Sequence, residues 1–218
     1  MPESALEIVS AIRLDLASLS QPNAGAVRRV GGSHCKALKS QPPKTVYRVV
    51  CSLLENATWA HRVIAWELLA SNNDAFKLLN DREAEKMSEG LDDWPSVDLF
   101  GVTVLGQAWR EGLVTDRKIH SWAKSSDRWR RRLALVATVP LNIQSRGGSG
   151  DAKRTLDVCR LLVQDRDDMV VKALSWALRE LAKRDPEVVS RFVKAEGDRL
   201  APRVRREVGN KLRTGRKN

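Results

Sequence analysis

Apolar residues recur along most of this chain at intervals of three and four positions, the spacing that places side chains on one face of an α-helix. The pattern covers residues 3–19, 46–56, 61–71, 96–113, 130–141, 155–165 and 170–184. No segment shows the alternation of a half-buried strand, because even the β-branched run at 102–105 lies within a longer helical pattern. The sequence therefore predicts an all-α protein.

Local signals predict where several of these helices begin and end. The sequence Asp185-Pro186-Glu187 is typical of a helix start, with an N-cap, a first-turn proline and an acidic first turn. Glycine and proline predict loops at 41–45 and 145–150 and a turn at 31–33. The 145–150 segment lacks the strand and the Lys-Ser/Thr of a phosphate-binding loop, so we interpret it as a flexible connection.

The helices repeat with a period near 35 residues. Trp59, Trp94 and Trp129 are equally spaced, and each precedes a similar apolar pattern. Residues 169–181 and 200–212 continue the series. A helical hairpin that recurs at this interval is typical of HEAT-like repeats. We therefore expect an α-solenoid with a basic concave face lined by the Trp-led helices.

The expected organisation is one HEAT-like repeat domain over residues 1–218. Within it we expect N-terminal helices at 1–50, central repeats at 51–145, basic C-terminal repeats at 151–213 and a tail at 214–218. No coiled-coil segment argues for an oligomer, so a monomer is expected.

Positive charge is concentrated in the second half of the chain. The formal net charge is +11; residues 1–116 contain 12 Lys and Arg against 15 Asp and Glu, whereas residues 117–218 contain 26 against 12. Such a concentration is typical of proteins that bind polyanions. A protein–protein scaffold, the commonest role of α-solenoids, would not explain it. The sequence therefore predicts a nucleic-acid partner.

Cysteine usage and hydropathy favour a cytoplasmic protein without a metal or another cofactor. Cys35, Cys51 and Cys159 are too widely spaced for a disulfide framework, so reduced thiols are expected. His34 adjoins Cys35, but no second pair completes a metal site. The first residues lack a secretory-signal pattern, and no apolar stretch of about 18 residues predicts a membrane span.

Trp94 and Asp98 are the most informative pair, because four residues make about one helical turn. An indole face beside a carboxylate suits a cation. If this helix instead faces the interior, Trp94 belongs to the core and Asp98 helps to satisfy a helix end.

A second group of residues combines an indole with positive charge. Lys172, Trp176 and Arg179 share one helix face, while the opposite face already supplies apolar core residues. Trp176 is therefore not needed for packing. Further candidates for contacts to DNA phosphates are Arg131, Arg132, Arg203 and Arg206.

A lone carboxylate among these cations would repel DNA, so Asp98 is expected to stabilise positive charge during a reaction. Release of a cationic N-alkylated purine passes through an oxocarbenium-like sugar, which a carboxylate can stabilise. The purine already carries the charge that makes it a good leaving group, so no general acid is needed. The predicted catalytic residues are Asp98, Trp94 and Trp176.

The segments DDWPSVD, DRWRRRLAL and VVKALSWALRELAKRDP occur in this order within residues 55–215. This arrangement resembles the AlkD-type DNA alkylation repair family of HEAT-like repeat DNA glycosylases. Residues 1–50 match that family poorly, and Pro95 stands where the family usually has a polar or aromatic residue.

The resemblance implies that the solenoid is C-shaped and that the protein is a monofunctional glycosylase that excises N3- and N7-alkylated purines from duplex DNA. It implies that Asp98 is the catalytic aspartate and that Trp94 and Trp176 face the lesion. Arg132 and Arg179 are implied contacts to the DNA backbone. A non-catalytic HEAT-like nucleic-acid-binding protein remains the alternative.

Overall fold

A computed structural model describes residues 4–217 as α-helices joined by turns and short loops, and no strand occurs among these residues. The all-α prediction is confirmed. Glu3, in the first predicted helix, and Asn218, in the predicted tail, lie outside the described residues. Contacts divide the chain into two compact units, Met1–Glu89 and Gly90–Asn218, which are described separately. The expected single domain stays a prediction.

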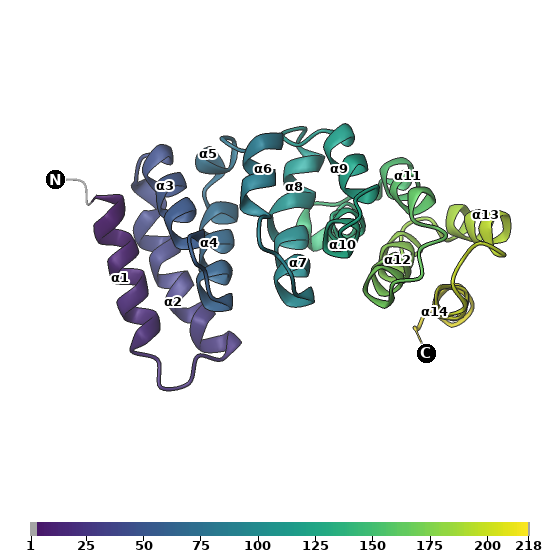
Figure 1. Cartoon of the computed structure of the whole chain (residues 1–218), viewed down its shortest axis with the longest axis horizontal. Helices are drawn as coiled ribbons and strands as arrows, with labels where there is room; N and C mark the ends of the chain where they lie inside the picture. The colour runs from purple at the N-terminus through teal and green to yellow at the C-terminus, as the bar shows by residue number, and fades with distance from the viewer. Residues whose placement is uncertain (1–3, 218) are drawn as a thin grey trace. The chain divides into compact units, whose positions relative to one another are not determined.

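The first unit is a group of packed helices in which α3 contacts α1, α4 and α5, and α2 lies against α4 (Figure 1). Its largest fully buried side chains include Trp66 and Phe76. The elements are α1 (Ala5–Ala17), α2 (Ala24–Ala37), the 3-10 turn η1 (Leu38–Ser40), α3 (Pro43–Leu54), α4 (Trp59–Ser71), α5 (Asn73–Phe76) and α6 (Asp81–Met87).

The turn predicted at residues 31–33 is wrong, because these residues lie inside α2. An added Cβ at Gly31 would lie 3.4 Å from the Ile64 side chain of α4, so this glycine faces a neighbouring helix. The predicted loop at 41–45 is shorter than expected, because Pro43 already begins α3. Proline is well suited to the first helical turn, where its missing N–H leaves no helical hydrogen bond unmade.

The second unit is built from consecutive helical hairpins. Helices α9, α11 and α13 pack against α10, α12 and α14 respectively, and α7, α10, α12 and α14 contact one another in succession (Figure 1). The elements are α7 (Trp94–Phe100), the π-helical turn η2 (Gly101–Leu105), α8 (Gly106–Arg110), α9 (Asp116–Ala123), α10 (Arg128–Val136), the 3-10 turn η3 (Gln144–Arg146), α11 (Ala152–Leu161), α12 (Asp168–Leu181), α13 (Pro186–Glu196) and α14 (Pro202–Thr214).

Aspartates cap the starts of five helices in this unit. Backbone N–H groups at the starts of α7, α10, α11, α12 and α13 donate to Asp93, Asp127, Asp151, Asp167 and Asp185. The helix start predicted at Asp185 is confirmed. Trp59 and Trp94 are the first residues of α4 and α7, and Trp129 is the second residue of α10. Each tryptophan of the 35-residue series therefore opens a helix.

The helix predicted over residues 96–113 contains a change of winding. It runs through α7, the π-helical turn η2 and α8. Gly101, at the start of η2, faces α10, where an added Cβ would lie 2.6 Å from the side chain of Val136. This close contact holds the segment that carries Asp98 against α10.

The loop predicted at 145–150 begins within η3, and backbone hydrogen bonds tie it to the preceding segment. The N–H groups of Gly148 and Gly150 donate to the carbonyls of Ile143 and Leu141 at 2.9 Å and 3.0 Å. Along residues 4–217, no helix combines the length and the apolar character that crossing a membrane requires.

Candidate functional site

Trp94 begins α7 with its side chain largely in solvent. The residue is 56% exposed, so it does not belong to the core. The capping role falls to Asp93, whose Oδ1 accepts from the Ser96 N–H at 2.8 Å. Pro95 occupies the first turn of the helix, where its missing N–H removes no helical hydrogen bond. Trp94 is therefore not a core residue, and Asp98 is not the residue that caps this helix.

Asp98 lies one turn after Trp94 and forms a two-pronged ion pair with Arg132 of α10. The Arg132 Nε–H donates to Oδ1 at 2.8 Å, and an Nη2–H donates to Oδ2 at 2.7 Å. The Asp98 side chain is 17% exposed and that of Arg132 only 6%. Arg132 also donates from Nη1 to the carbonyl oxygen of Met169 at 2.5 Å. One buried guanidinium thus joins α7, α10 and the first turn of α12.

The surroundings of Asp98 act on its ionisation in opposite directions. Burial raises the pKa of the Asp98 carboxyl above its ordinary value, and this effect outweighs the hydrogen bonds and charge of Arg132, which lower it. The charge of Asp93 adds a smaller upward shift of the same pKa. Arg132 therefore favours the ionised carboxylate at a position where burial alone would favour the acid.

Trp176 lies on α12 and is partly exposed, whereas its neighbours Ala173, Leu174 and Ala177 are fully buried. The role of this indole in the site stays a prediction. Trp176 stands seven residues after Met169, about 10 Å along the helix axis. Trp176 also lines a surface pocket of about 450 Å³, together with Asn142, Ile143, Gln144, Ser145, Glu180, Lys183 and Arg184.

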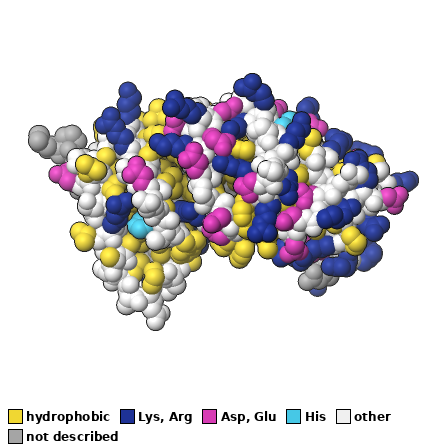
Figure 2. Space-filling view, in the orientation of Figure 1, with side chains coloured by type: hydrophobic (Ala, Val, Ile, Leu, Met, Phe, Trp, Pro, Cys, Tyr) yellow, Lys and Arg dark blue, Asp and Glu magenta, His cyan; other side chains and the backbone are white. Residues whose placement is uncertain are grey.

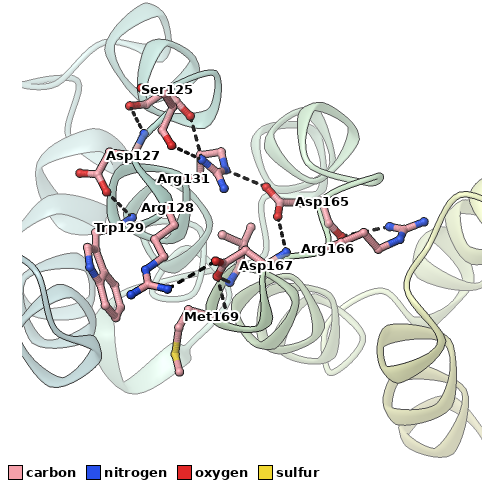
Figure 3. A network of polar contacts seen from close by, with 11 residues as sticks. Ser125, Asp127, Arg128, Trp129, Arg131, Asp165, Arg166, Asp167 and Met169 are labelled. Carbon is pink, nitrogen blue, oxygen red and sulfur yellow. Dashed lines mark hydrogen bonds and ion pairs between the residues drawn. The ribbon is translucent and has the colours of Figure 1, made fainter.

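Arg131, a predicted DNA contact, is held by partners within the chain. Its Nε–H donates to Asp165 at 2.7 Å, and its Nη1 donates to the carbonyls of Ser125 and Ser126 (Figure 3). The structure places Arg131 in an ion pair with the connection between α11 and α12, and the buried Arg132 in an ion pair with α7. A role for either arginine in DNA binding stays a prediction.

The start of α10 also presents an aromatic and basic pair. The Arg128 guanidinium lies 5.0 Å from the ring centroid of Trp129, and its Nη1 is 3.7 Å from a carboxylate oxygen of Asp167 (Figure 3). Asp167 in turn caps α12. These contacts fix the starts of α10 and α12 relative to each other.

Two of the other predicted DNA contacts share a carboxylate. Asp168, in the first turn of α12, lies 2.6 Å from the Lys172 ammonium and 3.0 Å from a guanidinium nitrogen of Arg203 on α14. Asp168 is not among the predicted site residues, although the four-residue spacing from Asp168 to Lys172 is a signal for an ion pair within a helix.

A second acid, Glu207, organises the remaining cations between α12 and α14. Its buried carboxylate accepts from the Ser175 hydroxyl at 2.6 Å and from the Arg203 Nε–H at 3.0 Å, and Arg179 lies 3.9 Å away. Arg206 projects into solvent from α14. Figure 2 shows Lys and Arg side chains gathered over the end of the second unit, where Figure 1 places α13 and α14.

The residues that could bind a metal are dispersed. Within residues 4–217 no three His, Cys, Asp or Glu side chains are grouped as a metal site. Cys35, Cys51 and Cys159 are free thiols, and burial raises the pKa of each above its ordinary value. A raised thiol pKa lowers the thiolate fraction, so these side chains are poor nucleophiles.

Comparison with known proteins gives one family. The sequence model for the DNA alkylation repair enzyme family matches residues 23–212. Proteins of curated function give no sequence match to the chain. The matched region extends from α2 to α14 and includes Trp94, Asp98, Arg132 and Trp176. The chain therefore belongs to the DNA alkylation repair enzyme family.

Proposed function

We propose that the protein is a monofunctional DNA glycosylase that hydrolyses the N-glycosidic bond of cationic N3- or N7-alkylated purines in duplex DNA. One observation carries the proposal: the Asp98 carboxylate is held by a buried arginine one helical turn after an exposed indole, Trp94. Membership of the DNA alkylation repair enzyme family supports it.

The arrangement suits stabilisation of a positively charged transition state. An alkylated purine leaves as a neutral base, while positive charge develops on the sugar that it leaves. A carboxylate near that sugar lowers the energy of the cation and can orient the attacking water. Two hydrogen bonds from Arg132 fix the direction of the Asp98 carboxylate, so little reorganisation is needed as the charge develops. Trp94 would add cation–π attraction to the lesion.

The remaining predicted residues would bind the DNA. We infer that phosphates lie along α12 and α14, where Lys172, Arg179, Arg203 and Arg206 would contact them without reading the base sequence. Trp176 would supply the second indole facing the lesion. The C-shaped solenoid with a basic concave face, the monomeric state and the cytoplasmic location stay predictions.

The test is single-turnover release of 7-methylguanine from duplex DNA. Asp98→Asn should lower the rate about 10²–10³-fold, the usual effect of removing one preorganised electrostatic contact. The matched control is Asp165→Asn. Asp165 also pairs with an arginine of α10 lying 34 residues away in the chain, but it belongs to the connection between α11 and α12. The control should keep most of the activity.

Two results would overturn the catalytic assignment. If Asp98→Asn excises as fast as wild type, the carboxylate takes no part in the reaction. If Asp98→Asn and Asp165→Asn lose activity equally, the loss reflects disturbance of α10 rather than chemistry at Asp98. Circular dichroism of both variants checks that the helices remain intact.

A non-catalytic DNA-binding protein is the second candidate, and the Asp98–Arg132 pair favours it. Arg132 bonds both carboxylate oxygens, so the pair can be explained by packing between α7 and α10 without any reaction. This candidate predicts that wild type binds duplex DNA in a salt-sensitive manner and releases no 7-methylguanine. Release that depends on Asp98 would exclude it.

A further inference from the structure

Asp168 places an exposed carboxylate between two cations that belong to different helices. Its Oδ2 lies 2.6 Å from Nζ of Lys172 on α12, and its Oδ1 lies 3.0 Å from Nη1 of Arg203 on α14. The Asp168 side chain is 60% exposed. An anionic oxygen between an ammonium and a guanidinium occupies the position that a phosphate oxygen would take in a DNA complex.

Arg203 keeps a second, more protected partner. Its Nε–H donates to Glu207 at 3.0 Å, and the Glu207 side chain is 6% exposed. The Ser175 hydroxyl donates to the other Glu207 oxygen at 2.6 Å. If Asp168 turned away, Glu207 would still hold the guanidinium through its Nε–H, and Nη1 would be left without its carboxylate partner.

The two acids therefore differ in how easily they can be displaced. Asp168 is well hydrated, so contact with water offsets the free energy lost when it separates from Lys172 and Arg203. Glu207 is buried, so if it separated from Arg203 its own charge would remain poorly hydrated. The start of α12, where Asp168 lies, also carries the partial positive charge of the helix dipole, which attracts any anion placed there.

We propose that Lys172 and Arg203 form a site for one phosphate of the DNA backbone, and that Asp168 occupies this site until DNA displaces it. This inference rests on the DNA binding in the proposed function. It gives Asp168 a role that the proposed function does not include. Asp168 weakens binding to undamaged DNA, because each binding event must first separate it from its two cations.

The salt dependence of binding should reveal the exchange. Each phosphate neutralised by protein contributes a slope of about −0.9 to the plot of log affinity against log salt. In the wild type, displaced Asp168 regains a counterion, which cancels most of that contribution. Without the carboxylate, the full contribution of this phosphate should appear.

The experiment measures binding of an unmodified duplex by fluorescence anisotropy between about 50 and 200 mM salt. Three variants each remove one negative charge: Asp168→Asn, Glu207→Gln and Asp157→Asn. Asp157 is the matched control, since it also pairs with two cations, Lys153 at 3.0 Å and Arg160 at 3.1 Å, but lies on α11. Long-range electrostatics alone predicts an equal gain in affinity for all three.

We expect Asp168→Asn to bind about threefold to tenfold more tightly than Asp157→Asn, as removal of two exposed ion pairs allows. Its salt slope should be steeper than that of the control by about 0.9. Glu207→Gln should bind no more tightly than wild type despite the same charge change, because Arg203 loses its orientation. Adding Lys172→Gln to Asp168→Asn should abolish the gain.

Equal affinity and slope for Asp168→Asn and Asp157→Asn would overturn the inference. If wild type still binds and excises in that case, the proposed function stands and only the role of Asp168 fails. If wild type does not bind duplex DNA at all, both fail together. A gain for Glu207→Gln as large as that for Asp168→Asn, with helical content unchanged, would also overturn the separation of roles.

Discussion

Replacing Arg132 by methionine should destabilise the fold strongly, and the loss should depend on pH. The substitution keeps an unbranched apolar chain but removes both hydrogen bonds to Asp98 and the one to the Met169 carbonyl. Breaking a buried ion pair by removing one partner costs about 3–5 kcal/mol. Since the Asp98 side chain keeps 17% of its surface in water, we expect the lower end, about 3 kcal/mol near pH 7.

The sign of the pH dependence follows from Asp98. Burial already raises its pKa in the folded wild type, and loss of Arg132 removes the interactions that lower it. The folded variant therefore has a still higher Asp98 pKa and binds a proton more readily than the unfolded chain does. Its stability relative to wild type should recover as the pH falls through that pKa, and the deficit should be largest near neutral pH.

Urea unfolding provides the measurement. The chain contains seven tryptophans, so fluorescence follows tertiary packing while circular dichroism follows the helices. Coincident transitions would justify a two-state free energy of unfolding, taken from the midpoint and slope. Arg128→Met on the same helix is the control. Arg128 has a longer, more exposed contact with Asp167, so its loss should cost at most about 1 kcal/mol.

A double-mutant cycle isolates the pair. In Asp98→Asn/Arg132→Met both charges are absent. The free energy of unfolding that the double variant loses should therefore be smaller than the sum of the two single losses by about 2 kcal/mol. A loss below about 1 kcal/mol in Arg132→Met, or an equal loss near pH 7 and near pH 4, would refute the assignment of Arg132 as the group that supports a charged Asp98.

Three further predictions follow from the same geometry. Trp94→Ala should change the free energy of unfolding by less than about 0.5 kcal/mol, because the side chain is largely exposed, while single-turnover excision should slow clearly; unchanged excision would remove Trp94 from the site. The excision rate should decrease as the pH is lowered, with an apparent pKa above that of an ordinary aspartate, because protonation of Asp98 removes its charge. A rate that stays constant through that pH range, after subtraction of uncatalysed release, would contradict this role. Gly148→Ala should lower the free energy of unfolding by about 1–3 kcal/mol, because the new methyl group would overlap the carbonyl oxygen of Pro140. Gly209→Ala, where an added Cβ has no neighbouring atom within 4 Å, should be neutral or stabilising in the same urea titration.

The helices were predictable because their signals are local. Apolar spacing and capping aspartates act within one or two turns, so the start at Asp185 and the tryptophans that open α4 and α7 follow from the sequence. The turn predicted at 31–33 is wrong for a tertiary reason. Gly31 faces α4 from within a helix and does not change the chain direction, and a single sequence does not distinguish these two positions of glycine.

The candidate site was predictable only in part. The spacing of Trp94 and Asp98 places both on one turn, and their exposure excludes a core role for the indole. The partner of Asp98 was not predictable from spacing within a helix, because Arg132 lies 34 residues away on a helix brought alongside by packing. Charge and family resemblance alone predict Arg132 as a contact to the DNA backbone.

The repeat period explains why so many cations in the second unit have acidic partners. Residues about one period apart lie at corresponding places in neighbouring helical hairpins, and three ion pairs use this offset: Asp98–Arg132 and Arg131–Asp165 at 34 residues, and Asp168–Arg203 at 35. Net charge therefore overstates the number of cations ready to meet a phosphate. The burial of each acid decides which cations can be released: Asp98 and Asp165 hold their arginines in the packing between helices, whereas Asp168 is hydrated enough to give way. Affinity for DNA should consequently depend less on the number of Lys and Arg residues than on which acids a phosphate can displace.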